Sequence, residues 1–175
     1  LHGTPADFKI YKSTDDGATF PIAVKPGEAG DANVYWSSLM VAPSNKQVVY
    51  VSGFRFVPDG SGTKREHLVF RSDDGGASWG AALPLTGLTL AQNSQIRIVG
   101  IASDAAKHVY ARVDVIDNTT TDALYVSDNS GASWNEIRRQ PDRFIAFIAR
   151  AATNPQGKHD LIAVTTKFGP EISHD

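Results

Sequence analysis

Residues 72–79 read Ser-Asp-Asp-Gly-Gly-Ala-Ser-Trp, and two other segments of the chain repeat this pattern. Residues 13–20 read Ser-Thr-Asp-Asp-Gly-Ala-Thr-Phe, and residues 127–134 read Ser-Asp-Asn-Ser-Gly-Ala-Ser-Trp. The shared pattern is Ser-x-Asp/Asn-x-Gly-x-Ser/Thr-Trp/Phe, and the stretch 173–175 begins like a fourth copy. Self-similarity of this kind indicates a repeat architecture. We refer to residues 13–20, 72–79 and 127–134 as the motif turns.

Short runs rich in β-branched and aromatic residues surround the motif turns, and each run is bounded by Gly, Pro, Asn, Asp or Ser. The runs are Val48–Val51, His67–Phe70, Val109–Val113, Ala123–Val126, Phe144–Ile148 and Leu161–Val164. No long window has the apolar spacing of an amphipathic helix. Each unit therefore contains four antiparallel strands, A to D, with the motif turn between C and D. Such units of about 40–50 residues are typical of propeller blades, so the predicted fold is an all-β β-propeller built of four-stranded blades.

The repeat also divides the chain. We expect residues 1–35 to hold strands C and D of one blade and residues 36–90 and 91–142 to be full blades. Residues 143–175 are expected to hold strands A to C of a further blade. A propeller needs about 4–8 blades to close. The 175 residues would therefore form an incomplete ring, with the remaining blades supplied by a longer chain or by other subunits.

Each residue type in the motif suits a turn between two strands. Glycine adopts a positive φ at little steric cost, and an Asp or Asn side chain accepts backbone N–H bonds within a turn. We expect the final aromatic residue to pack against its blade. An acidic catalytic or calcium site is the alternative interpretation, but one copy carries Asn129, whose amide cannot act as a general acid or base. The structural residues are Ser13, Asp15, Gly17, Phe20, Ser72, Asp74, Gly76, Trp79, Ser127, Asn129, Gly131 and Trp134.

With these residues the chain resembles the Asp-box, or BNR, repeats of sialidase-type β-propellers. Related repeats occur in xyloglucan-cleaving propellers, sortilin-type receptors and photosystem assembly factors. The resemblance covers the whole chain and implies the fold more than the chemistry, because one fold hosts many functions. It also implies that the ligand face lies opposite the motif turns, on the B–C and D–A loops.

Two predicted B–C loops, 54–66 and 114–122, supply most candidates for ligand binding. Arginine suits the carboxylate of an acidic sugar, and aspartate suits glycan hydrolysis or calcium. The alternative is that they are solvated loop residues. The ligand-face candidates are Arg55, Asp59, Arg65, Asp114, Asp117 and Arg143, with Tyr35, Trp36, Phe54, Phe56 and Phe168 as aromatic surfaces for sugars. No aligned catalytic set is evident, so the catalytic residues stay unassigned.

Composition excludes several classes of protein. With 17 basic and 19 acidic residues the chain lacks the positive charge of a nucleic-acid binder, and zero cysteines exclude a disulfide framework. No apolar run is long enough to span a membrane. We expect no cofactor, because no phosphate-binding or dinucleotide motif is present, and no metal, because the five histidines lack metal-ligand spacing.

These observations leave three functional hypotheses. The first is a glycan- or protein-binding module of an exported, periplasmic or secreted protein. The second is a sialidase-like or xyloglucanase-like glycoside hydrolase whose active site is completed by blades outside this chain. The third is an assembly or scaffold factor. The extracytoplasmic location is implied mainly by the resemblance.

Overall fold

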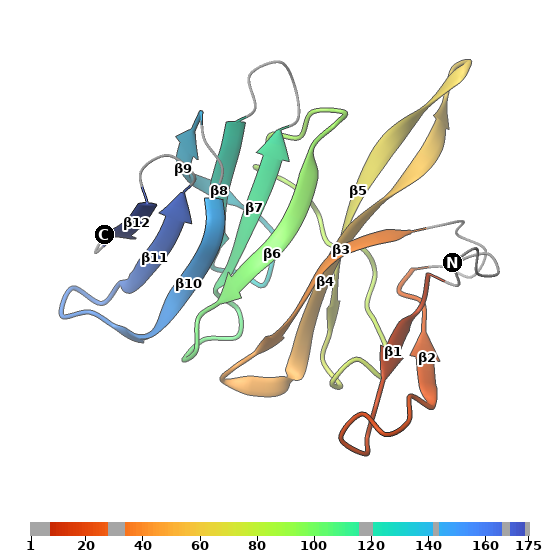
Figure 1. The fold of residues 1–175 in the computed structure, drawn as a ribbon, viewed down its shortest axis with the longest axis horizontal. Helices are drawn as coiled ribbons and strands as arrows, with labels where there is room; N and C mark the ends of the chain where they lie inside the picture. Colours follow the sequence, from red (N-terminus) through yellow and green to blue (C-terminus); the bar gives the residue numbers. More distant parts are fainter. Residues whose placement is uncertain (1–7, 28–33, 116–120, 142–143, 166–168, 174–175) are drawn as a thin grey trace.

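The computed structural model describes residues 8–27, 34–115, 121–141, 144–165 and 169–173 (Figure 1). Within these ranges the chain forms twelve β-strands in four antiparallel sheets and contains no helix. The all-β prediction is therefore confirmed. In the same part of the chain, no helix of the length and apolarity needed to cross a membrane is found.

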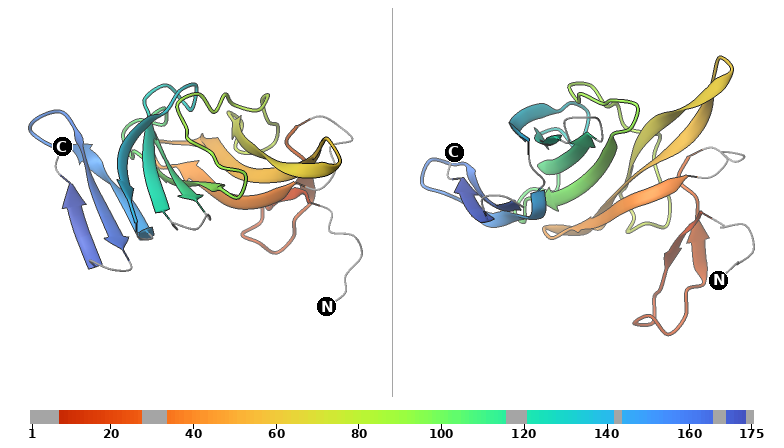
Figure 2. Two further views of the ribbon diagram at one scale, coloured as in Figure 1. Left: turned by 90° about the horizontal axis from the view of Figure 1, so that it is seen from above. Right: turned by 45° about the horizontal axis from the view of Figure 1, so that its top comes forward.

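The four sheets follow one another in chain order. The first pairs β1 (Ile10–Lys12) with β2 (Ile22–Val24), and the second contains β3 (Tyr35–Ala42), β4 (Asn45–Asp59) and β5 (Gly62–Ser72). The third contains β6 (Gln95–Ile101), β7 (Val109–Val115), β8 (Thr121–Ser127) and β9 (Asn135–Gln140). The fourth contains β10 (Phe144–Thr153), β11 (His159–Thr165) and β12 (Gly169–Ser173). β6 contacts both β3 and β10, so the first strands of three sheets lie next to one another, and the described strands form no closed ring (Figures 1 and 2).

The second sheet has three strands, whereas the repeat predicts four. After β5 the chain makes only two backbone hydrogen bonds to it, from Gly80 N to Arg71 O at 3.0 Å and from Leu83 N to Val69 O at 2.8 Å. In the third sheet, the corresponding segment forms the full strand β9. Pro84 follows directly after Leu83, and a proline has no N–H with which to continue a ladder. The limits of the individual blades remain a prediction.

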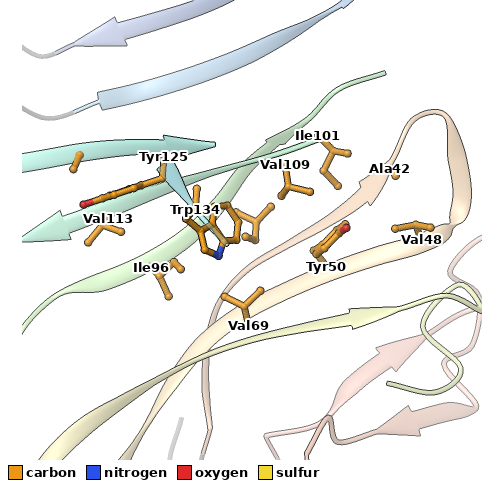
Figure 3. Packing of buried hydrophobic residues seen from close by; sticks show 13 residues of the cluster. Ala42, Val48, Tyr50, Val69, Ile96, Ile101, Val109, Val113, Tyr125 and Trp134 are labelled. Carbon is orange, nitrogen blue, oxygen red and sulfur yellow. The ribbon is translucent and has the colours of Figure 1, made fainter. Parts of the chain in front are cut away.

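The main core lies between the second and third sheets (Figure 3). Tyr50 and Val69 point into it from the second sheet, and Ile96, Val113 and Tyr125 from the third. Val51 and Phe70, the next residues along β4 and β5, belong to a second cluster that includes Ile10 of the first sheet. Because successive side chains of a strand point to opposite faces, the second sheet is buried on both sides.

Serine hydroxyls join β3 and β4 to β6 at a register shift between Trp36 and Ser38. Ser37 Oγ donates to the carbonyl of Ile96 at 2.6 Å, and the Ile98 N–H donates to Ser38 Oγ at 2.8 Å. Ser52 Oγ also lies 3.0 Å from the Ile96 carbonyl and is fully buried. These bonds satisfy buried polar groups and fix β6 against β3.

The aromatic residues of the three motif turns have different surroundings. Trp134 is only 3% exposed and packs in the core between its own sheet and the preceding one, and Trp79 likewise packs in the cluster towards the first sheet. Phe20 is 55% exposed, so the expectation that it packs against its blade is wrong. Both tryptophans pack towards the preceding sheet. Phe20 belongs to the β1–β2 sheet, and no sheet precedes that one among the described residues.

Candidate functional site

A long β-hairpin projects from the second sheet. The last pair between β3 and β4 joins Tyr35 to Phe54, whereas β4 and β5 continue to pair from Arg55–Glu66 to Asp59–Gly62. We call residues 55–66 the hairpin arm; it extends beyond the rest of its sheet (Figures 1 and 2). The expectation of a loop over 54–66 is therefore wrong.

The arm forms because its sequence favours strands and a tight turn. Phe54, Phe56 and Val57 have high β propensity, and the sequence Asp-Gly-Ser-Gly at 59–62 allows a two-residue turn. Gly60, the first turn residue, has φ +60°. The favoured two-residue hairpin turns require a positive φ at this position. Pro58 is tolerated because it lies beyond the end of the pairing with β3, where β4 is an edge strand.

An aromatic cluster lies where the arm leaves the sheet. The rings of Tyr35 and Phe54 are stacked with centroids 5.2 Å apart, and Phe56 meets Phe54 edge-on at 5.6 Å. Tyr35 and Phe56 remain 41% and 50% exposed. The Arg65 guanidinium makes a cation–π contact with the Phe54 ring, with Cζ 4.4 Å from the ring centroid. Contacts of this kind hold the rings in place, while Tyr35 and Phe56 stay partly exposed to solvent.

A groove of about 240 Å³ runs beside the arm. Arg65 lines it, and its Nη1 donates to the carbonyls of Asn93 and Ser94 at 3.2 and 3.3 Å. Asp59 and Lys64 lie near the tip with Oδ1 and Nζ 3.6 Å apart, and burial lowers the pKa of the His67 imidazole. The residues that line the groove are Asp59, Lys64, Arg65, His67, Leu90, Ala91 and Gln92.

The structure brings two of the predicted site residues, Asp59 and Arg65, into this groove. Arg55 pairs with Glu66 one position away, so it lies on the opposite face of the arm from Arg65. Asp117 and Arg143 lie outside the described residues. Sequence reasoning placed Lys64 in the predicted 54–66 loop and Gln92 in a predicted D–A loop, but it missed His67, Leu90 and Ala91, which only the fold brings to the groove.

The prediction of Asp114 as an acidic loop residue is wrong. It lies in β7 and is 5% exposed, and its Oδ1 is 2.7 Å from Arg112 Nε. Arg112 Nη2 also contacts Asp122 Oδ2 at 2.9 Å, and Asp122 is 1% exposed. Arg112 thus neutralises two buried carboxylates from neighbouring strands. The alternation Arg112-Val113-Asp114 could have indicated that both charged residues share a face of one strand.

The three motif turns have the same hydrogen bonds. The hydroxyls of Ser13, Ser72 and Ser127 each accept the N–H of the motif glycine at 2.8 Å, and Gly17, Gly76 and Gly131 have φ of +87°, +85° and +87°. Oδ1 of Asp15, Asp74 and Asn129 accepts the N–H of the residue four positions later, at 2.9, 2.8 and 2.9 Å. The Ser13 and Thr19 bonds lower the pKa of Asp15 to about 2. Within the described ranges, no three His, Cys, Asp or Glu side chains form a possible metal site.

Replacing Asp74 with alanine is expected to lower the unfolding temperature by several degrees at pH 7. The change removes the acceptor of the Ser78 N–H and Ser78 hydroxyl bonds, which hold the pKa of Asp74 well below its usual range. Because the folded-state pKa is lowered, this stabilisation is present above about pH 4 and is lost as the pH falls further. Thermal unfolding of both proteins between pH 7 and pH 2 should therefore give curves that converge in acid.

Asp74→Asn provides the matched control, because Asn129 makes the equivalent bonds in the third motif turn. It should keep most of the unfolding temperature at pH 7 and lose only the part of the acid dependence that comes from Asp74, since Asp15 and other carboxylates with lowered pKa values remain. An unfolding temperature for Asp74→Ala equal to that of the unmodified protein would contradict the role of this turn.

Comparison with known proteins finds a distant relative. A xyloglucanase from Hypocrea jecorina (strain QM6a) is 23% identical over 186 residues, which cover 95% of this chain. The chain spans 20% of the length of that enzyme. No protein-family model matches the chain.

Proposed function

We propose that this chain is part of a glycoside-hydrolase-like β-propeller and that it binds a carbohydrate chain in the groove beside the hairpin arm. Three Asp-box-like turns with the same hydrogen bonds support the propeller, as do consecutive antiparallel sheets with neighbouring first strands. The distant similarity to a xyloglucanase supports the glycoside-hydrolase-like class. As a polysaccharide-binding module it would act outside the cytoplasm.

The observation that carries the proposal is the aromatic cluster beside the polar groove. A sugar ring has apolar C–H faces, which stack on aromatic rings, and hydroxyls at its edge, which need hydrogen-bond partners. The exposed ring of Phe56 offers the first kind of contact. The side chains of Asp59, Lys64 and Gln92 in the groove offer the second. The Arg65 bonds to Asn93 and Ser94 fix the arm beside the groove, so the site is held in place before binding.

Replacing Phe56 with alanine is expected to weaken binding of soluble xyloglucan by about three- to tenfold, because one stacking contact of about 0.5–1.5 kcal/mol is lost. Titration calorimetry with the polysaccharide measures this directly. Phe20→Ala is a matched control, since Phe20 is 55% exposed against 50% for Phe56 but lies on a motif turn. Equal weakening by both variants, or no binding by the unmodified protein, would overturn the proposal.

Hydrolysis is the second candidate function, favoured by the similarity to an enzyme named for cleaving xyloglucan. Glycoside hydrolases of the common kind need two carboxyl groups on either side of the scissile bond. In the described part of the groove, Asp59 is the one lining carboxylate, so a partner would come from elsewhere in the protein. New reducing ends released from xyloglucan would show hydrolysis, whereas binding without them would support a binding module.

A further inference from the structure

The chain contains three Asp–Gly dipeptides, at residues 16–17, 59–60 and 74–75. An aspartate followed by glycine can close a five-membered ring, in which the glycine nitrogen bonds to the Cγ atom of the aspartate side chain. Glycine permits this reaction because it has no Cβ to crowd the nitrogen and its backbone rotates readily. The dipeptide alone does not rank the three sites, so the fold decides which of them reacts fastest.

Hydrogen bonds hold the glycine nitrogen in the two motif turns. The Gly17 N–H donates to Ser13 Oγ at 2.8 Å, and the Gly75 N–H donates to the carbonyl of Gln47 at 2.7 Å. The nitrogen must lose its proton when it bonds to Cγ, so a bond to that proton slows the reaction, as it slows hydrogen exchange. In the part of the chain that the structure describes, no acceptor is found for the N–H of Gly60.

The three sites also differ in how open they are. The dipeptide 59–60 lies at the tip of the hairpin arm, which extends beyond the rest of its sheet (Figure 1). A Cβ built on Gly60 or Gly17 would meet no atom within 4 Å, whereas one on Gly75 would lie 3.0 Å from the Gln47 side chain. The Asp59 side chain is 58% exposed. Space therefore favours 59–60 and 16–17 over 74–75, and the unbonded N–H favours 59–60 over 16–17.

We propose that Asp59 is the site at which this protein isomerises fastest to isoaspartate, and that the product disrupts the tip of the hairpin arm. The Gly60 nitrogen bonds to Cγ of the protonated Asp59 carboxyl group, the bond from Cγ to the hydroxyl breaks, and the hydroxyl leaves with the N–H proton as water. Water then adds to one of the two carbonyl carbons of the ring. Addition at Cγ restores aspartate, and addition at the backbone carbon gives isoaspartate. The water released is taken up again, so no other reactant is needed.

Isoaspartate at this position changes the groove, a consequence that rests on the proposed carbohydrate site. The main chain of isoaspartate runs through the side chain and is one carbon atom longer. Two-residue hairpin turns match the twist of their strands, so the extra atom breaks the last pair of the arm, between Asp59 and Gly62. The carboxylate that lines the groove also moves to the α-carbon. We therefore expect the modified protein to bind xyloglucan more weakly.

Peptide mapping of the whole protein after incubation at 37 °C and pH 6 tests the site. Electron-transfer fragmentation distinguishes isoaspartate from aspartate in each of the three peptides. Isoaspartate is expected to form at Asp59 about three- to tenfold faster than at Asp16, the factor that one hydrogen bond contributes. It should form most slowly at Asp74, where the nitrogen is bonded and space is least. A rate at Asp16 or Asp74 that equals or exceeds the rate at Asp59 would overturn the proposal.

The same mapping in urea separates the effect of the fold from that of the sequence. The hydrogen bonds that distinguish the three sites are absent in the unfolded chain, so the three rates should become similar. If the lead of Asp59 persists unchanged in urea, the fold does not set it and the proposal is wrong.

Asp59→Glu is the matched variant for the effect on the groove, because a glutamate would have to close a six-membered ring, which forms much more slowly. On incubation, the affinity of the unmodified protein for xyloglucan should fall as isoaspartate accumulates, and that of Asp59→Glu should stay at its own starting value. Equal losses in both proteins, or isoaspartate without a loss of affinity, would contradict the effect on the groove. Absence of binding before incubation would contradict the proposed function alone, since the peptide maps decide the isomerisation independently.

Discussion

Replacing Arg112 with methionine is expected to lower the free energy of unfolding by about 3–5 kcal/mol. Arg112 contacts Asp114 at 2.7 Å and Asp122 at 2.9 Å, and the side chains of the two carboxylates are 7% and 1% exposed. Without the guanidinium, the two neighbouring carboxylates would lose their closest positive charge, and Arg97, whose Nε lies 3.8 Å from Asp114 Oδ2 and whose side chain is 39% exposed, would compensate them only in part. The large cost therefore comes from the charges left behind and not from the net contribution of the ion pairs.

Urea unfolding at pH 7 measures this cost, and two further proteins test its cause. Lys64→Met removes a comparable ion pair whose side chains are 52% and 58% exposed, and it should cost less than about 1 kcal/mol. The triple variant Arg112→Met/Asp114→Asn/Asp122→Asn removes all three charges and should recover part of the lost stability. A triple variant less stable than Arg112→Met alone would contradict incompletely compensated carboxylates as the cause.

The motif turns could be predicted from the sequence because their contacts are local. Every hydrogen bond that Asp74 makes in its turn joins residues at most four positions apart, and so does the bond from the Gly76 N–H to Ser72. Such bonds depend on residue type and spacing alone. The β-strands were predictable for a related reason, since runs such as Val109–Val113 favour extended backbone whatever packs on them.

The hairpin arm and the buried ion pairs were harder to predict, because long-range contacts decide them. Polar and glycine residues at 59–66 are as typical of a loop as of an exposed hairpin, and only the pairing of Phe56 with Arg65 distinguishes the two. The position of Asp114 directly after a strand run is equally typical of an acidic loop residue. Its burial depends on Arg112 and on Asp122, which is brought beside it by the pairing of β7 with β8.

The contact between the imidazole rings of His108 and His159 could not be predicted from their spacing in the sequence. His108 and His159 belong to different sheets, and their contact depends on how the third and fourth sheets pack. The five histidines show no metal-ligand spacing, and the sequence holds no other signal that relates these two. Contacts between side chains of different sheets are visible only once the sheets are placed in space.

Replacing Trp134 with alanine is expected to lower the free energy of unfolding by about 3–5 kcal/mol. The indole is 3% exposed and packs against both the second and third sheets (Figure 3). The chain also depends on it for a loop contact, because the Trp134 N–H donates to the carbonyl of Thr86 at 2.9 Å. The next residue, Gly87, has φ +92° and lies against the backbone of Trp134. A Cβ at position 87 would lie 2.0 Å from the Trp134 carbonyl oxygen, so no larger residue fits there without a shift of the backbone.

The repeat supplies its own controls, since the same motif position carries Phe20, Trp79 and Trp134. The cost of truncation should follow burial, so Trp134→Ala should cost most and Trp79→Ala less. Phe20→Ala should cost under about 0.5 kcal/mol, because its ring is 55% exposed. Urea midpoints of the three variants, with Trp134→Phe as a smaller truncation, establish the order. Phe20→Ala could instead lower the free energy of unfolding as much as Trp134→Ala does. That result would show that the aromatic residue stabilises the motif turn itself, and packing between sheets would then not explain why every copy has one.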